Sequence, residues 1–476
     1  MKYKKEFFLI LIIAMVIRLT PVMIYGMPIS YDAPYHERIA MNTLQLQSIP
    51  HIDESLGGRI NIYPPMYSLF LAQLSLITGL SVNVLGMILL PIISSFLVLS
   101  VFVLVKRLRN EFFAVIAALL TAIATPLIAA AFDSPENIML FAMPIIVLFI
   151  FLKKEKLGAG FYSLGLLWNY FFALINIIPA IIAFRKQKKF LFNSMIGFII
   201  IGLFYFFTKG ANSFSSQNPS IGIDLILFNL GSFIPLFFVL ILLLVLPILF
   251  VSFKQKLSEE LRFFQIFIII GIISIIALLF TPFFRPWEQI KFMSISSIIL
   301  LCCVPSNFFK KYTAFIGIIF LIFSLLLSFQ VVFPRITKTD QNAISFLAEL
   351  NSTGTILAEP SFSEHIRILT GMNDRLLTSL YFENQGEKSF LSESISFLQN
   401  EFSAVEEKEF FAKTNLHYLI LNYEDLETAK AVNARNSNEF NKIYSLNYFQ
   451  PCLFDFIPKS IAYSCYANET IIFEKN

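Results

Sequence analysis

The strongest constraint on the fold is a series of long apolar segments between the N-terminus and about residue 333. They lie near 6–25, 86–105, 112–131, 138–152, 157–184, 190–207, 226–252, 263–280, 289–305 and 312–333. A helix needs about 20 predominantly apolar residues to cross a bilayer. The chain is 57% hydrophobic and 14% charged, whereas a soluble domain carries roughly 25% charged residues. We therefore expect a polytopic α-helical membrane protein.

Two of the apolar segments need a decision before the spans are counted. Segment 157–184 is longer than one span requires and has basic residues at both ends, so we expect a hairpin of two short spans and about eleven spans in all. Segment 61–80 is also apolar, but counting it as a span would move later basic loops to the opposite side of the membrane. We expect it to lie as a helix in the outer interface, or as a shallow re-entrant one.

Lysine and arginine predict the orientation of the chain. With "MKYKK" at the N-terminus placed inside, the strongly basic short loops, such as "KRLRN" and "RKQKK", all lie on the cytoplasmic side. The first outer loop then covers 26–85, and the tail lies outside. This assignment predicts a cell-membrane protein with a cytoplasmic N-terminus and an extracytoplasmic C-terminal region.

The tail differs in composition from the rest of the chain. Its apolar runs shorten to strand length at 355–359, 417–422 and 470–475, with helical patterns between them at 392–400 and 424–432. Alternating strands and helices are typical of a small α/β domain. We predict two domains, a transmembrane domain over 1–333 and an extracytoplasmic α/β domain over 334–476.

The first outer loop opens with the densest polar cluster of the chain, "YDAPYHERI" at residues 31–39. Asp32 follows the first span closely, where a carboxylate can act as a general base on an incoming hydroxyl or bind a divalent metal. His36 lies four residues later and would share a helix face with Asp32. We predict both as catalytic residues, with His36 orienting Asp32, assisting metal binding, or solvating the interface.

Two further outer loops carry residues suited to a charged substrate. Asp133 and Glu136 leave another span at the same level as Asp32, and three carboxylates could form an oxygen-rich Mg²⁺ or Mn²⁺ site. Arg285 and Lys291 are cations at the same surface and are suited to binding a phosphate. A phosphate site beside a base at the membrane surface predicts a lipid-phosphate substrate.

These motifs and their order resemble the GT-C superfamily of membrane glycosyltransferases. "YDAPYHERI" is similar to the Asp, Tyr-His and Arg pattern of AglB-type oligosaccharyltransferases, and "AFDSPENIMLF" resembles their second acidic loop. "RPWEQIKFM" stands where relatives carry an Arg before a late span. The similarity in architecture covers most of the chain, although the motifs are short.

The resemblance implies transfer of a sugar from a polyprenyl-phosphate or polyprenyl-pyrophosphate (for example dolichyl) donor on the outer face. The Trp-Trp-Asp-Tyr-Gly motif of oligosaccharyltransferases, implicated in reading the acceptor sequon, is absent. The acceptor is therefore open among protein, lipid and glycan. The expected partners are the donor, the acceptor and membrane lipid, and no nucleic acid is expected.

Two other functions compete with glycosyl transfer. A transporter or flippase for a lipid-linked or anionic solute usually places ionisable residues at mid-membrane and often has an internal repeat, whereas the polar clusters here lie at one surface. A non-catalytic membrane scaffold would leave the convergence of Asp32, Asp133 and Arg285 unexplained.

Overall fold

A computed structural model describes most of the helices and strands of the chain. The described residues are 3–25, 32–50, 52–53, 59–60, 66–124, 127–128, 136–168, 170–209, 245–246, 248–278, 286–304, 338–350, 354–358, 363, 366, 370, 404–421, 440–449 and 467–475. The description below is confined to these residues.

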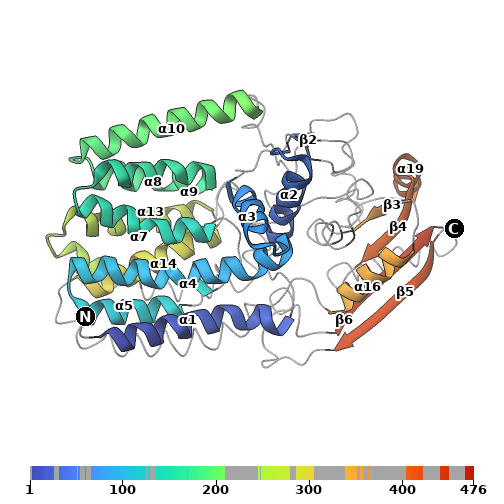
Figure 1. The fold of residues 1–476 in the computed structure, drawn as a ribbon, viewed down its shortest axis with the longest axis horizontal. Coiled ribbons are helices and arrows are strands. Elements are labelled where there is room, and N and C mark those ends of the chain that lie inside the picture. The colour runs from blue at the N-terminus through green and yellow to red at the C-terminus, as the bar shows by residue number, and fades with distance from the viewer. Residues whose placement is uncertain are drawn as a thin grey trace.

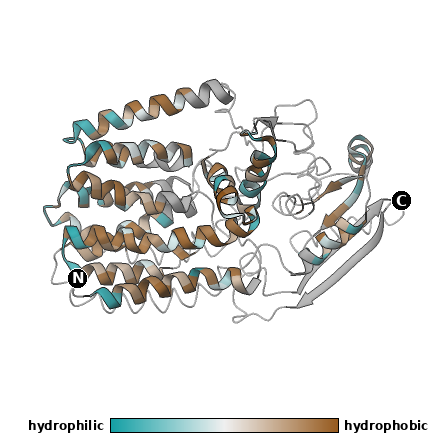
Figure 2. Cartoon of the chain, in the orientation of Figure 1, coloured by the Kyte–Doolittle hydropathy of each residue, from teal (hydrophilic) through white to brown (hydrophobic). Residues whose placement is uncertain are grey.

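Roughly parallel helices form a bundle, and a second unit with a β-sheet lies beyond one end of it (Figure 1). The bundle helices are α1 (Lys4–Tyr25), α4 (Val82–Leu108), α5 (Glu111–Ile123), α7 (Glu136–Phe151), α8 (Glu155–Trp168), α9 (Tyr170–Ala183), α10 (Lys188–Lys209), α13 (Glu259–Leu278) and α14 (Pro286–Cys303). Apolar residues run along these helices (Figure 2).

Length and composition distinguish two of the described helices as candidate membrane spans. Lys4–Met23 and Val82–Leu108 are both long and apolar enough to cross a bilayer. Met66–Thr78, Glu111–Ile123, Leu140–Phe151 and Lys291–Cys303 are apolar but shorter. The structure is mostly helical, as expected, and the number of about eleven spans stays a prediction.

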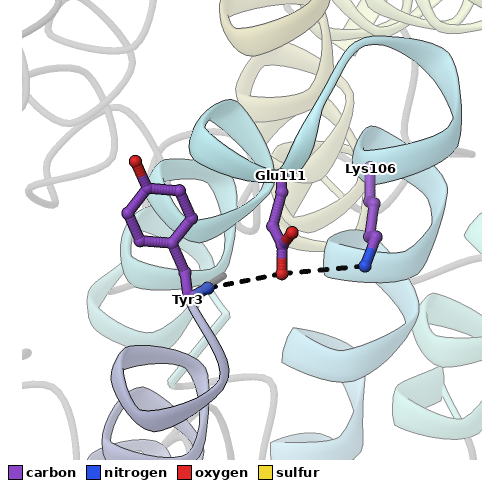
Figure 3. Close-up of polar contacts among 3 residues, drawn as sticks. All are labelled: Tyr3, Lys106 and Glu111. Atoms are coloured by element: carbon purple, nitrogen blue, oxygen red, sulfur yellow. Dashed lines mark hydrogen bonds and ion pairs between the residues drawn. The ribbon is translucent and has the colours of Figure 1, made fainter. Parts of the chain in front are cut away.

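The N-terminus and the basic helix connections gather at the end of the bundle that lies away from the sheet. A Glu111 carboxylate oxygen accepts a hydrogen bond from the backbone N–H of Tyr3 at 3.5 Å and lies 3.7 Å from Nζ of Lys106 (Figure 3). At the same end, Lys186 lies 3.9 Å from a Glu259 oxygen. These contacts join the ends of helices that the Lys and Arg pattern places on one side of the membrane.

The apolar segment 112–131 is not one continuous helix, because α5 ends within it and helical geometry returns only at Leu127 and Ile128 among the described residues. Helix α5 ends at Ile123, and Ala124 is extended (φ −65°, ψ 115°). Pro126 has no backbone N–H to continue the helical ladder, and its ring disfavours helical geometry at the preceding residue. The helix therefore stops after 13 residues.

Arg18 of α1 binds the carbonyl groups at this early end of α5. Its fully buried guanidinium donates hydrogen bonds to the carbonyl oxygens of Ala122 (3.0 Å) and Thr121 (3.2 Å), and also to Ser94 Oγ of α4 (3.1 Å). The last carbonyls of a helix have no partner within the helix. Arg18 supplies that partner and joins α1, α4 and α5.

The other sequence-based helices agree more closely with the structure. The expected hairpin over 157–184 appears as two helices, α8, which ends at Trp168, and α9, which begins at Tyr170. The helix expected over 61–80 appears as α3 (Met66–Thr78), whose end exposes Leu76 and Ile77. Its place in the outer interface stays a prediction. The segment 312–333 and most of 226–252 lie outside the described residues, as do the helical patterns at 392–400 and 424–432.

The described part of the segment between α1 and α4 contains two helices and two short strands. Helix α2 (Asp32–Leu46) and helix α3 lie between the bundle and the sheet (Figure 1). Strands β1 (Ile52–Asp53) and β2 (Arg59–Ile60) form a small antiparallel pair between them in sequence. A buried apolar cluster that includes Ala40, Tyr67 and Leu85 holds α2, α3 and the start of α4 together.

The C-terminal part contains a four-stranded mixed sheet in the order β3-β4-β6-β5. Strands β3 (Thr355–Leu357) and β4 (Leu416–Leu421) are parallel, whereas β6 (Ala467–Lys475) runs antiparallel to β4 and to β5 (Phe440–Phe449). Helix α16 (Lys338–Glu349) packs on the sheet through Ile344 and Leu347, and α19 (Ala404–Thr414) precedes β4. The predicted strands at 355–359, 417–422 and 470–475 are confirmed.

Candidate active site

Helix α2, which lies between the bundle and the sheet (Figure 1), is polar in sequence but buried in the structure. Every residue from Ala33 to Ala40 is buried. The buried set includes His36 (1% exposed), Glu37 (0%) and Arg38 (2%). Buried ionisable groups seldom contribute net stability, because the loss of hydration offsets what their contacts gain. Their concentration on one short helix therefore marks a candidate functional site.

His36 faces α3. Its Nδ1 atom lies 3.5 Å from Ser68 Oγ, and the direction of that hydrogen bond depends on the histidine tautomer. The imidazole also meets the rings of Tyr35 and Tyr67 edge to face, with centroids 5.3 Å away in both cases. These contacts hold the ring in one orientation, as a residue that orients a neighbouring carboxylate requires.

Glu37 faces α4 at Gly86. A Cβ atom built on Gly86 would overlap the Glu37 carboxyl group. Neither carboxyl oxygen of Glu37 has a hydrogen-bond partner among the described residues. Burial raises the pKa of the Glu37 carboxyl well above its usual range, because a charge there would lose its hydration. Burial therefore favours the protonated form of this carboxyl group more than solvent exposure would.

Further polar atoms surround the contact between α2, α3 and α4. The hydroxyl of Tyr67 is buried without a hydrogen-bond partner in the described part of the chain, as are Nδ2 of Asn42 and Oδ1 of Asn83. Burial, and then the nearby charge of Glu37, raise the pKa of Tyr67. Asn83 lies one turn before Gly86 on α4, so it is on the helix face that meets α2.

The structure places the predicted carboxylates only in part. Asp32 is the first residue of α2, and Glu136 is the first residue of α7, but neither side chain is among those described. Asp133 lies outside the described residues. Both helix starts belong to the end of the molecule opposite the basic connections (Figure 1). The fold thus brings the Asp32 and Glu136 backbones to one end of the bundle.

The predicted phosphate-binding cations are likewise placed in part. Arg285 lies outside the described residues and immediately precedes α14. Lys291 lies in the second turn of α14 and is 5% exposed. A buried ammonium group needs an anion or several oxygen atoms around it, so its position is compatible with either an anionic ligand or an internal role.

The predicted Mg²⁺ or Mn²⁺ site is not represented among the described side chains. Within the described part of the chain, no group of three His, Cys, Asp or Glu residues could hold a metal ion. The donor set of Asp32, Asp133 and Glu136 has the hard oxygen chemistry that these cations prefer. Since those side chains are outside the described set, the metal site stays a prediction.

The overall fold is shared with solved membrane glycosyltransferases. The apo oligosaccharyltransferase of Archaeoglobus fulgidus superimposes with a TM-score of 0.61 at 12% identity, over 96% of this chain and 75% of that one. ArnT of Cupriavidus metallidurans, bound to undecaprenyl phosphate, gives 0.56 at 10% identity over 97% of both chains. These proteins are GT-C glycosyltransferases. The chain has the GT-C fold.

A third GT-C structure, the arabinofuranosyltransferase AftD from Mycobacteria, matches 99% of this chain and 40% of its own length, with a TM-score of 0.54 at 12% identity. Other structures of the archaeal enzyme AglB contain an inhibitory peptide with dolichol-phosphate, or Zn and sulfate. No protein-family model and no curated protein sequence matches the chain. The fold is thus shared with these structures at a sequence identity of only 10–13%.

Glu37 lies within the polar cluster of the sequence, but none of the motifs there assigns it a role. The available signal was the spacing of Ala33, Glu37 and Ala40, which recur at intervals of four and three residues and so share a helix face. Small residues on both sides of a glutamate indicate a closely packed face. The partner across that face, Gly86, is 49 residues away and could be found only in the folded GT-C structure.

Proposed function

We propose that the chain is an integral-membrane glycosyltransferase that transfers a sugar from a polyprenyl-phosphate or polyprenyl-pyrophosphate donor to an acceptor on the outer face of the membrane. The GT-C fold supports the class of enzyme. Structural neighbours contain dolichol-phosphate, undecaprenyl phosphate and an acceptor peptide. The observation that carries the proposal is the buried polar helix α2, which begins at Asp32 close after the first span.

The proposed topology has about eleven spans, a cytoplasmic N-terminus and the sheet unit outside. It is supported by the separation in the fold between the basic connections at one end and α2, α3 and the sheet at the other (Figure 1, Figure 2). Exposed Leu76 and Ile77 on α3 suit a helix that touches the outer leaflet. In this orientation, Asp32 meets a lipid-linked donor at the membrane surface.

The proposed reaction replaces the bond between the anomeric carbon and the donor phosphate oxygen with a bond to the acceptor. Asp32 takes the proton of an acceptor hydroxyl or amide as that group attacks, and the phosphate leaves with the bonding electrons. His36, held by α3, orients Asp32. Arg285 and Lys291 stabilise the charge that develops on the leaving phosphate.

A divalent cation would assist this reaction if Asp32, Asp133 and Glu136 hold it together. Bound at those carboxylates, Mg²⁺ or Mn²⁺ would supply a positive charge next to the phosphate. The zinc present in one structural neighbour is consistent with a divalent ion in this fold. Asp32 would then have two roles, as a ligand of the ion and as the group that takes the acceptor proton.

The proposal is tested by transfer assays with the purified full-length protein in detergent or vesicles. A panel of polyprenyl-phosphate and polyprenyl-pyrophosphate sugars is offered with protein, lipid and glycan acceptors. Transfer of a sugar from at least one lipid-linked donor, and none from the matching nucleotide sugars, is the expected result. Donor movement across the bilayer without any transfer would favour a flippase and overturn the proposal.

A further inference from the structure

The contact between Glu37 and Gly86 is not explained by the proposed chemistry. Glu37 is fully buried, and its carboxyl group occupies the volume that a side chain at residue 86 would need. Gly86 is itself buried on α4. The glycine is required there because the acid approaches the α4 backbone closely. The two residues therefore form a complementary pair across the α2–α4 interface.

The pair lies where α4 can serve as a rigid support. Helix α4 has 27 residues and is therefore about 40 Å long, whereas the hydrocarbon core is about 30 Å thick. Gly86 is in the second turn of α4, at the end that meets α2 and α3. A helix anchored in the bilayer thus extends beyond it and presents a glycine to the helix that carries Asp32.

Packing strength alone does not explain the choice of an acid at residue 37. An apolar side chain of similar size would fill the same space without the cost of burying two carboxyl oxygens that have no partner in the described part of the chain. Among the described residues, ionisable neighbours of Glu37 are His36 and Arg38, which adjoin it on α2, and Tyr67 on α3. The charged residues of α4, Lys106 and Arg107, lie at its opposite end.

We propose that Glu37 is a positioning residue. Its packing against Gly86 of α4 fixes the position of α2, and thereby the positions of Asp32 and His36 at the reaction centre. This inference rests on the proposed glycosyltransferase function. Asp32 lies five residues before Glu37, about 7.5 Å along the helix axis. A displacement of α2 by about 1 Å moves the catalytic groups and can lower a rate by about a hundredfold.

The role is tested with Gly86→Ala, Glu37→Ala, the double variant, Glu37→Gln and the control Gly202→Ala. The control adds a methyl group to helix α10 where no atom lies within 4 Å. Gly86→Ala should lower kcat at least about tenfold, because its new methyl group pushes against the Glu37 carboxyl. KM for the lipid donor should stay within about twofold, since the residues proposed to bind its phosphate, Arg285 and Lys291, do not belong to α2.

The double variant separates positioning from simple damage. Removing the Glu37 carboxyl makes room for the new methyl group. The kcat of the double variant should therefore be at least about tenfold higher than the kcat expected if the two single losses multiplied. Glu37→Gln keeps the shape and should stay within about threefold of the wild type. If the two single losses in kcat simply multiply in the double variant, the proposal is overturned, even if the melting temperatures show that the two residues interact. A Glu37→Gln variant as slow as Glu37→Ala would also overturn it. If the wild type transfers no sugar, the proposed function is refuted instead. The melting temperatures of the two single variants and the double variant would then show whether the pair is only structural.

Discussion

The Glu37 carboxyl group of α2 lies against the backbone of Gly86 on α4, in the space that any larger residue at position 86 would occupy. Both residues are buried, and the carboxyl oxygens lack a hydrogen-bond partner among the described residues. A buried acid at a helix junction costs stability. Its presence five residues after Asp32 connects packing at the bundle end to the candidate chemistry.

Glu37 should make the stability of the protein depend on pH. Because burial raises its pKa in the folded protein, the folded state keeps a proton that the unfolded chain loses above a pKa of about 4.3. The free energy of unfolding should therefore fall as pH rises from that value toward the folded pKa. Glu37→Gln removes this loss, so its advantage over the wild type should grow with pH, by up to about 1.4 kcal/mol per pH unit.

The melting temperatures of the wild type and of Glu37→Gln, measured between about pH 5 and pH 8, test this effect. Folded proteins are usually stable in that pH range. The difference between Glu37→Gln and the wild type cancels contributions from other titrating groups, including His36. A difference that is constant over this range would mean that Glu37 is ionised in the folded protein.

Arg18 should contribute strongly to the stability of the packing between α1, α4 and α5. Replacing it with Met leaves the Thr121 and Ala122 carbonyls without their donor, whereas Lys keeps the charge but lacks the planar fork of donors that reaches both carbonyls and Ser94 at once. Hydrogen bonds to charged groups contribute about 1.5–3 kcal/mol each, so both variants should melt well below the wild type. Unchanged melting of Arg18→Met would show that these bonds add no net stability.

The proposed topology makes a direct prediction about accessibility. In a cysteine-free background, cysteine replaces Lys154 at the basic end or Ala412 in α19, both of which are exposed. A membrane-impermeant thiol reagent added to intact cells should label the residue 412 variant, and should label the residue 154 variant only after permeabilisation. The reverse pattern would invert the chain and place Asp32 on the cytoplasmic side.

The rate of sugar transfer should depend on a divalent ion if Asp32, Asp133 and Glu136 bind one together. Removing metal with EDTA should lower transfer by at least about a hundredfold, and Mn²⁺ or Mg²⁺ should restore it, because the ion offsets charge on the leaving phosphate. Asp133→Asn should raise the metal concentration needed for half-maximal rate. Full activity in EDTA would remove the metal from the account and leave the cations of the protein to stabilise the phosphate.

The sequence predicts most of the described helices because spans are specified by local composition. Apolar length and the Lys and Arg pattern predict α1, the pair of helices α8 and α9, and a helix at α3. They fail where a single residue ends a helix, as at Ile123 before Pro126, and they miss β5. Contacts such as Glu37 with Gly86 depend on how helices meet, and no local pattern specifies that.

The most direct test of the account compares sugar transfer by the wild type and by Asp32→Asn, with Glu111→Gln at the opposite end of the bundle as a control. All three proteins should insert and melt alike apart from small shifts. Asp32→Asn should lose at least about a hundredfold in transfer from the lipid-linked donor, since Asn accepts no proton and binds metal weakly, while Glu111→Gln keeps its activity. Transfer by Asp32→Asn at the wild-type rate would contradict the account.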